Sequence, residues 1–325
     1  MNSAFLGLDT SNYRTSLAVV DEEGKILLNQ RKLLPVPEGE RGLRQSDAVY
    51  AHLKQLKPML MELRRLEGAY SLRAVCASVA PRGREDSYMP VFEVGDTMGR
   101  AVASAMGIPF FPTDHQRGHL QAAAYGTELE GQDHFLAIHL SGGTTDLLSL
   151  EGEFLWELGS SLDLHAGQLV DRVGVALGLS FPAGPELEEL AVQGSGGGRL
   201  GCAMTDGDLS CHLSGAETQA QRWIQEGSLS QEEIAWEVYD LLSRTVARML
   251  AAGQRKTGQQ RALICGGIAS SALFRRILQE RLRKQQSRLR VIFGSPELSG
   301  DNAVGVALIG WKKWKAGLES SGVKF

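Results

Sequence analysis

The sequence predicts an α/β fold of two duplicated lobes, each a mixed sheet flanked by helices. One observation is an internal repeat: residues 5–20 read FLGLDTSNYRTSLAVV and residues 135–150 read FLAIHLSGGTTDLLSL. Each copy has two apolar runs joined by a loop of small polar residues, which is typical of a β-hairpin. The other is that strand and helix patterns alternate after each copy, in a chain of 325 residues that is long enough for two cores.

The first lobe is expected to cover residues 1–130. After the first hairpin, residues 25–32 have the pattern of a third strand, and residues 46–66 have the pattern of a helix. Buried-strand and helix patterns then alternate over residues 74–79, 94–106, 108–111 and from residue 114 onward. The predicted order is three strands followed by helix, strand, helix, strand and helix.

The second lobe is expected to cover residues 131–325 and to repeat this order, with a helical, glycine-rich insertion around residues 160–255. Its three-strand meander is predicted over residues 135–140, 146–150 and 154–158. The later elements are predicted as helices 164–177, 185–192 and 232–249, strand 262–265, helix 270–283, strand 291–293 and helix 302–314. The run GSGGGRLG at residues 194–201 is either a flexible loop or a mobile flap.

The composition indicates a soluble, cytoplasmic protein. Hydrophobic residues make up 43% and charged residues 22% of the chain, and no apolar run is long enough for a membrane span. The N-terminus lacks a basic segment, so no signal peptide is expected, and the four cysteines form no CxxC pair. The net charge of -4 argues against a protein that wraps nucleic acid over its whole surface.

Two histidines have the spacing of a metal site. His115 and His119 are four residues apart, which on a helix places both imidazoles on one face. Asp301, at the start of the last predicted helix, is the preferred third ligand, and Asp114 is its rival. The alternative is that the histidines are surface or capping residues and that either aspartate is an ordinary helix N-cap.

Two glycine-rich turns follow predicted strands, LSGGTT at residues 140–145 and CGGIASS at residues 265–271. Glycine lets backbone N–H groups approach a phosphate or adenosine, although it also serves ordinary turns. Together they indicate a nucleotide site without a P-loop, because no GxxxxGK[ST] run occurs. Asp171, between apolar helix faces, is a candidate substrate contact. The chain has no GxSxG run, and no Ser/His/Asp set stands out.

Several motifs together resemble one known family. The set HxxGH, SGG-T, DxxAGxxxDRxxxxLGLxxPxGP, GGxAS and GDNAxG is similar to that of the tRNA threonylcarbamoyladenosine transferases, also called O-sialoglycoprotein endopeptidases or M22 glycoproteases. That family lies within the actin, sugar kinase and heat-shock chaperone superfamily. The resemblance covers nearly the whole chain in order. It implies two RNase H-like lobes with a nucleotide and metal cleft between them.

The resemblance also implies an activity and its ligands. Family members transfer a threonylcarbamoyl group from its adenylate to N6 of the adenosine next to the tRNA anticodon. One divalent metal, iron in preference to zinc, would be held by His115, His119 and Asp301. ATP or an acyl-adenylate would contact Asp9, Leu140, Ser141, Gly142, Gly143, Thr144, Asp171, Gly184, Gly266, Gly267 and Ser271. No catalytic residue is assigned.

The implied partners are tRNA and the proteins of a threonylcarbamoylation complex, with a homodimer left open and no membrane. Peptidase activity is disfavoured because the histidine pair lacks the accompanying glutamate. A sugar-kinase-like or carbamoyltransferase activity is a weaker alternative, since a plain sugar kinase binds Mg²⁺ through phosphates.

The chain departs from the family pattern at positions close to these motifs. Arg117 stands where the family has Glu, Thr144 where it has His, and Glu217 where it has Lys. Leu164 and Ser271 replace an acid and an asparagine. Charge reversals near a phosphate-bearing substrate are not neutral. They leave an alternative open, a diverged nucleotide- and metal-binding paralogue with a regulatory or scaffold role and no transfer activity.

Overall fold

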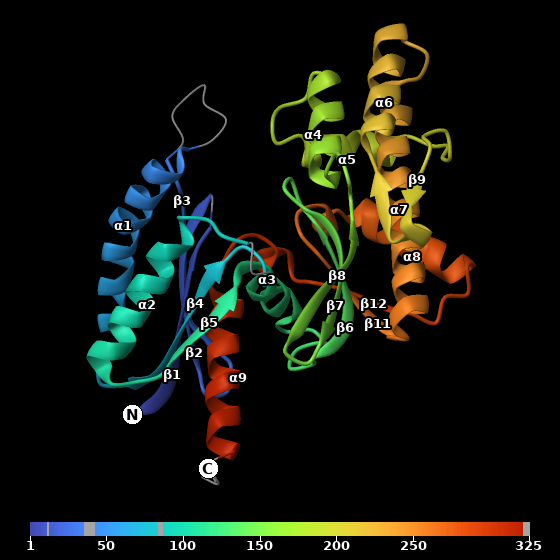
Figure 1. Cartoon of the computed structure of the whole chain (residues 1–325). Helices are drawn as coiled ribbons and strands as arrows, with labels where there is room; N and C mark the ends of the chain where they lie inside the picture. The colour runs from blue at the N-terminus through green and yellow to red at the C-terminus, as the bar shows by residue number, and fades with distance from the viewer. Residues whose placement is uncertain (12, 36–42, 84–86, 321–325) are drawn as a thin grey trace. The chain divides into compact units, whose positions relative to one another are not determined.

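The computed structural model describes residues 1–11, 13–35, 43–83 and 87–320. The chain forms two compact units, Met1–Tyr125 with Gly300–Phe325 as unit 1 and Gly126–Ser299 as unit 2 (Figure 1). Each unit contains a five-stranded mixed sheet with flanking helices, so the predicted α/β class is confirmed. Among the described residues, no helix is long and apolar enough to cross a membrane.

The two sheets have the same strand order, which confirms the duplication. Sheet 1 runs β3-β2-β1-β4-β5 and sheet 2 runs β8-β7-β6-β11-β12. In each sheet the first three strands pair antiparallel and the last two join in parallel. The strands of sheet 1 are β1 (Asn2–Thr10), β2 (Arg14–Asp21), β3 (Ile26–Leu33), β4 (Tyr70–Ala80) and β5 (Phe110–Asp114). The predicted first hairpin is therefore present, with Phe5 opposite Val20.

Side chains alternate between the two faces of sheet 1, as a β-strand requires. Ala4, Leu6 and Leu8 of β1 point to one face, where they share a core with α1 (Gln45–Met61) and α2 (Phe92–Met106). A short 3₁₀ turn, Glu62–Leu66, continues from α1 toward β4.

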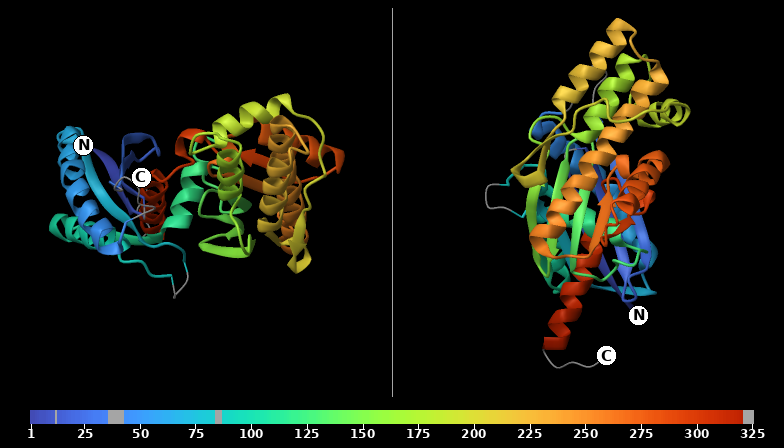
Figure 2. Two further views of the ribbon diagram at one scale, coloured as in Figure 1. Left: turned by 90° about the horizontal axis from the view of Figure 1, so that it is seen from above. Right: turned by 90° about the vertical axis from the view of Figure 1, so that its right-hand side faces the viewer.

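The opposite face of sheet 1 is covered by α9 (Val304–Ser320). Phe5 points to this side, and its ring centroid is 5.1 Å from that of Trp314. Gly7 points the same way and lets the helix come close to the strand. Figure 2 shows α9 on one side of this sheet and α1 with α2 on the other. Asp9 is the next residue of the alternation, so the strand directs its carboxylate to the α9 side.

Helix α9 belongs to unit 1, although the expected boundary placed every residue after 130 in the second lobe. Close backbone packing explains the difference. A Cβ at Gly7 would lie 2.5 Å from the carbonyl oxygen of Ala303, just before α9. A Cβ at Gly305 would lie 1.9 Å from the carbonyl oxygen of Gly118 in α3 (His115–Ala124). Only glycine allows such approaches, and they attach the last helix to the first sheet.

Sheet 2 is built around a three-strand meander, as predicted: β6 (His134–Leu140), β7 (Thr145–Glu151) and β8 (Phe154–Ser160). Strands β11 (Arg261–Cys265) and β12 (Arg290–Phe293) extend it in parallel. The 27-residue α7 (Gln231–Thr257) contributes many buried side chains to the core of this unit. The remaining elements of unit 2 are α4 (Ala166–Ala176), α5 (Gly184–Gln193), α6 (Ser214–Glu226), α8 (Ala272–Lys284), the ribbon β9 (Ala203–Thr205) with β10 (Ser210–His212), and the 3₁₀ turns Asp206–Asp208, Ile268–Ser270 and Pro296–Leu298.

The glycine-rich run at residues 194–201 is bonded to α7 and does not form a free flap. The carboxylate of Glu237, which is fully buried, accepts backbone N–H groups of Gly197, Arg199 and Leu200 at 2.8, 2.9 and 3.2 Å. Asp240 accepts the N–H of Gly198 at 3.0 Å. Consecutive glycines are needed because residues 196–198 all have positive φ angles.

Asp163 holds the start of α6. Its carboxylate accepts the N–H of Leu213 at 2.8 Å and the hydroxyl of Ser214 at 2.5 Å. Burial opposes ionisation, but these hydrogen bonds and those from other backbone N–H groups lower the pKa of Asp163 to about 2.

We expect Asp163→Ala to lower the free energy of unfolding at pH 7 by about 1 kcal/mol, because the cap of α6 is lost. A depressed carboxyl pKa stabilises the fold above the unfolded value near 4, and this contribution is lost as the pH falls toward 2. In urea titrations, the difference in free energy of unfolding between parent and variant should therefore shrink as the pH falls from 4 to 2. The exposed Glu153→Ala variant is the control, and a pH-independent difference would contradict the assignment.

We expect Gly305→Ala to destabilise the protein by about 1–3 kcal/mol, because its methyl group would overlap the backbone of α3. Gly317→Ala in the same helix is the matched control, since a Cβ there meets no atom within 4 Å. It should stabilise by about 0.5–1 kcal/mol through the helix propensity of alanine. Thermal unfolding measures the stability of both variants. Equal changes in stability would contradict the close packing of Gly305 against α3.

Candidate metal centre and ligand loops

The local structure of α3 places His115 and His119 on one face. Strand β5 ends at Asp114, whose carboxylate accepts the N–H of Arg117 at 2.8 Å and so caps the helix. The helix begins at His115, and the four-residue spacing brings His119 above it. Asp114, the rival third ligand, is used as the cap and is not part of the histidine cluster.

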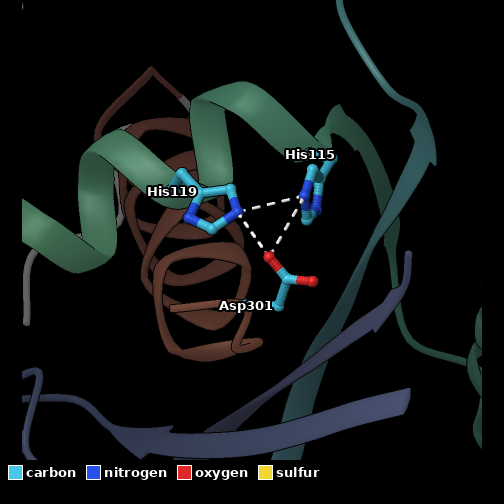
Figure 3. Close-up of side chains that lie close together, drawn as sticks. All are labelled: His115, His119 and Asp301. Atoms are coloured by element: carbon cyan, nitrogen blue, oxygen red, sulfur yellow. Dashed lines mark hydrogen bonds and ion pairs between the residues drawn. The ribbon is translucent and has the colours of Figure 1, made fainter. Parts of the chain in front are cut away.

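Asp301 lies just before α9 and points toward the histidines (Figure 3). It is not the helix cap, because the side chain of Asn302 accepts the N–H of Val304 at 3.0 Å. The guanidinium of Arg14 donates to the carbonyl oxygen of Asp301 at 3.2 Å. The backbone of Asp301 is therefore anchored, and its carboxylate is left for the cluster.

The three side chains meet with the geometry of a metal site. The Nε2 atoms of His115 and His119 are 3.0 Å apart, and Oδ1 of Asp301 is 3.0 Å from His119 Nε2 and 3.7 Å from His115 Nε2. An ion bound tetrahedrally at about 2.1 Å would separate its ligand atoms by about 3.4 Å. One donor atom of each residue faces the same point, so the residues present fit a single ion.

Two residues of the first hairpin support this cluster from behind. Asp9 is fully buried, and its carboxylate oxygens lie 2.9 and 3.0 Å from Nδ1 of His115. Ser11 donates its hydroxyl to Oδ2 of Asp301 at 2.8 Å. The resemblance implied that Asp9 contacts the nucleotide and that the loop from Asp9 to Thr15 faces the phosphates, whereas the carboxylate of Asp9 is bonded to a histidine of the cluster. Ser11 and Arg14 lie in this loop, and their contacts with Asp301 were not expected.

The electrostatics of the cluster are those of closely packed opposite charges. Burial lowers the pKa of His115, but the charge and hydrogen bond of Asp9 and the charge of Asp301 raise it to about 9. Burial opposes ionisation of Asp301 as well, yet the hydrogen bond from His119 and the neighbouring positive charges hold the pKa of its carboxyl well below the usual range. A metal ion would therefore compete with a proton for His115.

In unit 2, residues 140–144 form a tight turn at the end of β6. The N–H of Ser141 donates to the carbonyl of Thr144 at 2.9 Å, and their hydroxyls are 2.7 Å apart. Gly142 and Gly143 are exposed, and no atom lies within 4 Å of a Cβ built on either. The turn is therefore exposed at its two glycines, although the N–H of Gly143 donates to the hydroxyl of Ser141 at 3.2 Å.

The second glycine turn lies directly beside the first. Gly266 has a φ of +95°, and a Cβ there would lie 2.1 Å from the carbonyl oxygen of Leu140. Gly267 leads into the 3₁₀ turn that precedes α8, and the hydroxyl of Ser271 caps α8 by accepting the N–H of Phe274 at 3.0 Å. Since β6 and β11 are parallel, both turns lie at carboxyl ends of strands, where α/β sheets commonly bind ligands.

Helices α4 and α5 adjoin these turns. The N–H of Gly167 in α4 donates to the carbonyl of Ser141 at 3.0 Å. Asp171, further along α4, accepts the N–H of Ala183 at 2.9 Å, and burial raises the pKa of its carboxyl. Gly184 opens α5, and its carbonyl accepts the hydroxyl of Tyr239 at 3.0 Å. Except for Asp9, the candidate nucleotide contacts thus all lie in unit 2, around one end of its sheet.

Three solved structures share this fold at low sequence identity. Component A of (R)-2-hydroxyglutaryl-CoA dehydratase from Acidaminococcus fermentans is 16% identical, with a TM-score of 0.54 over 96% of this chain and 99% of its own. A ROK family glucokinase from Streptomyces griseus is 14% identical, with a TM-score of 0.54 over 95% and 99%. HypF from T. kodakarensis is 13% identical, with a TM-score of 0.62 over 99% of this chain and 48% of its own.

These likenesses show a two-lobed fold of the actin and sugar-kinase type, as expected from the motifs. A family model described as tRNA N6-adenosine threonylcarbamoyltransferase (TsaD) matches residues 46–308, which is most of the chain. This span includes the three residues of the cluster and the two glycine turns of unit 2. The chain therefore belongs to the tRNA N6-adenosine threonylcarbamoyltransferase family.

Proposed function

We propose that the protein transfers a threonylcarbamoyl group from its adenylate to N6 of the adenosine next to the anticodon of tRNA, with one bound metal ion. The observation that carries this proposal is the convergence of His115, His119 and Asp301 in a chain of this family. Two imidazoles and one carboxylate with open positions are the ligand set of non-haem Fe(II) sites. This donor set supports iron in preference to zinc.

The metal would supply Lewis acidity toward a carbonyl or phosphate oxygen of the substrate. The role of Asp9 is to accept the hydrogen on Nδ1 of His115, which leaves the lone pair of Nε2 directed at the ion. Asp301 would bind through Oδ1, since Ser11 occupies Oδ2. The contacts of the first hairpin thus determine which atom of His115 and of Asp301 would face the ion.

The adenylate would lie along the two glycine turns of unit 2. The exposed backbone of Gly142 and Gly143 suits a phosphate, and the N-terminus of the adjoining α4 adds partial positive charge. Asp171 and Gly184 would lie near the ribose, while Gly266, Gly267 and Ser271 would lie at the adenine end. A net charge of -4 supports the proposal that partner proteins of a cytoplasmic threonylcarbamoylation complex present the tRNA.

A diverged paralogue that binds nucleotide and metal without transfer is the second candidate. It is favoured by the local contacts of the residues that depart from the family pattern. Arg117 Nε lies 3.8 Å from the carboxylate of Asp114, and Thr144 closes its own turn through Ser141. Ser271 is used as a helix cap. Thr144 and Ser271 are thus engaged within the chain, as a scaffold role would allow, whereas the buried Nε of Arg117 has no hydrogen-bond partner among the described residues.

The metal proposal predicts that purified protein contains close to one equivalent of iron or zinc and that His115→Ala contains almost none. Two ligands remain in that variant, and they are not sufficient to retain the ion through dialysis. His134→Ala is the matched control, because His134 is exposed and its Nδ1 lies 2.7 Å from the carboxylate of Asp133. Elemental analysis measures the metal content of the parent and of both variants. Equal metal content in all three proteins would exclude the site.

The transfer proposal predicts modified adenosine in tRNA when the metal-loaded chain receives threonylcarbamoyl adenylate, tRNA and its partner proteins. We expect His119→Ala to reduce product more than about 100-fold, because the Lewis acid is lost. Mass spectrometry of digested tRNA measures the product. A metal-loaded parent that binds the adenylate in calorimetry but yields no product would favour the paralogue instead.

A further inference from the structure

We propose that Ser11 and His52 are positioning residues for the metal ligand Asp301, and that the turn after β1 serves as a frame for the metal centre. The inference rests on the metal site of the proposed function. It concerns the turn of the first hairpin, which the family resemblance implied would face the phosphates of the substrate. Asn12, within that turn, lies outside the described residues.

The first step is the contact between Ser11 and Asp301. The Ser11 hydroxyl is 2.8 Å from Oδ2 of Asp301, and Ser11 is only 3% exposed. A carboxylate only accepts hydrogen bonds, so the hydroxyl must donate. The bond occupies one carboxylate oxygen and turns the other toward His119, 3.0 Å away. Without it, Asp301 could rotate or bind through either oxygen.

The second step is the contact between His52 and Ser11. His52 lies in α1, is fully buried, and has Nε2 2.9 Å from the carbonyl oxygen of Ser11. A carbonyl cannot donate, so Nε2 carries the hydrogen. Burial lowers the pKa of His52, against the hydrogen bond with Ser11 and the charge of Asp9, which raise it.

The third step is what holds the ring of His52. Its Nδ1 is 2.8 Å from the hydroxyl of Thr15, which is also 2.7 Å from Oε1 of Gln55. Gln55 is oriented in turn, because its Nε2 donates to the carbonyl of Leu33 at 2.8 Å. The backbone of Ser11 is therefore tied to α1 and β3 by fully or largely buried groups. The hydrogen-bonded route from His52 to Asp301 runs through Ser11, whose carbonyl contacts His52 and whose hydroxyl contacts Asp301.

The test is titration of metal-free protein with Co²⁺, followed by its visible absorption and by competition with a chelator. We expect Ser11→Ala to weaken Co²⁺ binding about 10–100-fold and to change the absorption band, as loss of an outer hydrogen bond does at other metal sites. Ser11→Thr keeps the hydroxyl and should restore both readouts. Ser16→Ala is the matched control, since its buried hydroxyl in the adjacent strand has no hydrogen-bond partner in the described part of the chain.

His52→Leu should also weaken Co²⁺ binding, as Ser11→Ala does. His52→Gln can donate a hydrogen bond from a similar position, so it should recover part of the lost Co²⁺ affinity. The double variant Ser11→Ala/His52→Leu should bind no more weakly than Ser11→Ala alone, because both act on one contact. Fully additive losses of Co²⁺ affinity would contradict the proposal that His52 acts through Ser11. If His52→Leu does not fold, the Ser11 variants still test whether Ser11 positions Asp301. Unchanged Co²⁺ binding in Ser11→Ala overturns the inference alone, whereas absence of Co²⁺ binding in the parent overturns the metal site as well.

Discussion

The close approach of α9 to β1 and α3 is the constraint on which the rest of unit 1 depends. Backbone meets backbone at Gly7 and at the crossing of Gly118 with Gly305, where no side chain fits. Asp301 lies only a few residues before this crossing, and both histidines belong to the helix that is crossed. Their donor atoms meet because the elements that carry them cannot separate without opening packed backbone.

The two halves of the duplication use the same hairpin for different purposes. In unit 2 the turn of residues 140–144 exposes its glycines and lies beside Gly266, as a ligand-binding turn would. In unit 1 the corresponding turn directs Ser11 toward a carboxylate and is tied from behind by His52. The hairpin supplies a stable strand pair in both units, and the few polar residues at its turn decide what it contacts.

Much of the fold was predictable because it depends on local pattern. Apolar runs joined by short polar loops predicted both hairpins and the meander of unit 2, and the repeat predicted that strands and helices would follow in the same order along each half. The shared strand order of the two sheets agrees with this repeat. The place of α9 was not predictable in this way. Its apolar face would fit many sheets, and only the match of Gly305 and Gly7 to a neighbouring backbone assigns it to unit 1. The glycine-rich run at residues 194–201 was similarly ambiguous, since its partner Glu237 is about 40 positions away.

The sequence by itself determined which residues have the chemistry of a metal site, because the spacing of His115 and His119 is a property of one helix. It also determined the family, through motifs that are local and ordered along the chain. Only the tertiary structure brought Asp301, rather than Asp114, beside the two histidines, and placed Asp9 against His115 and Ser11 against Asp301. The physical reason is that these contacts join segments far apart in the sequence, and their geometry depends on backbone packing that no local pattern encodes.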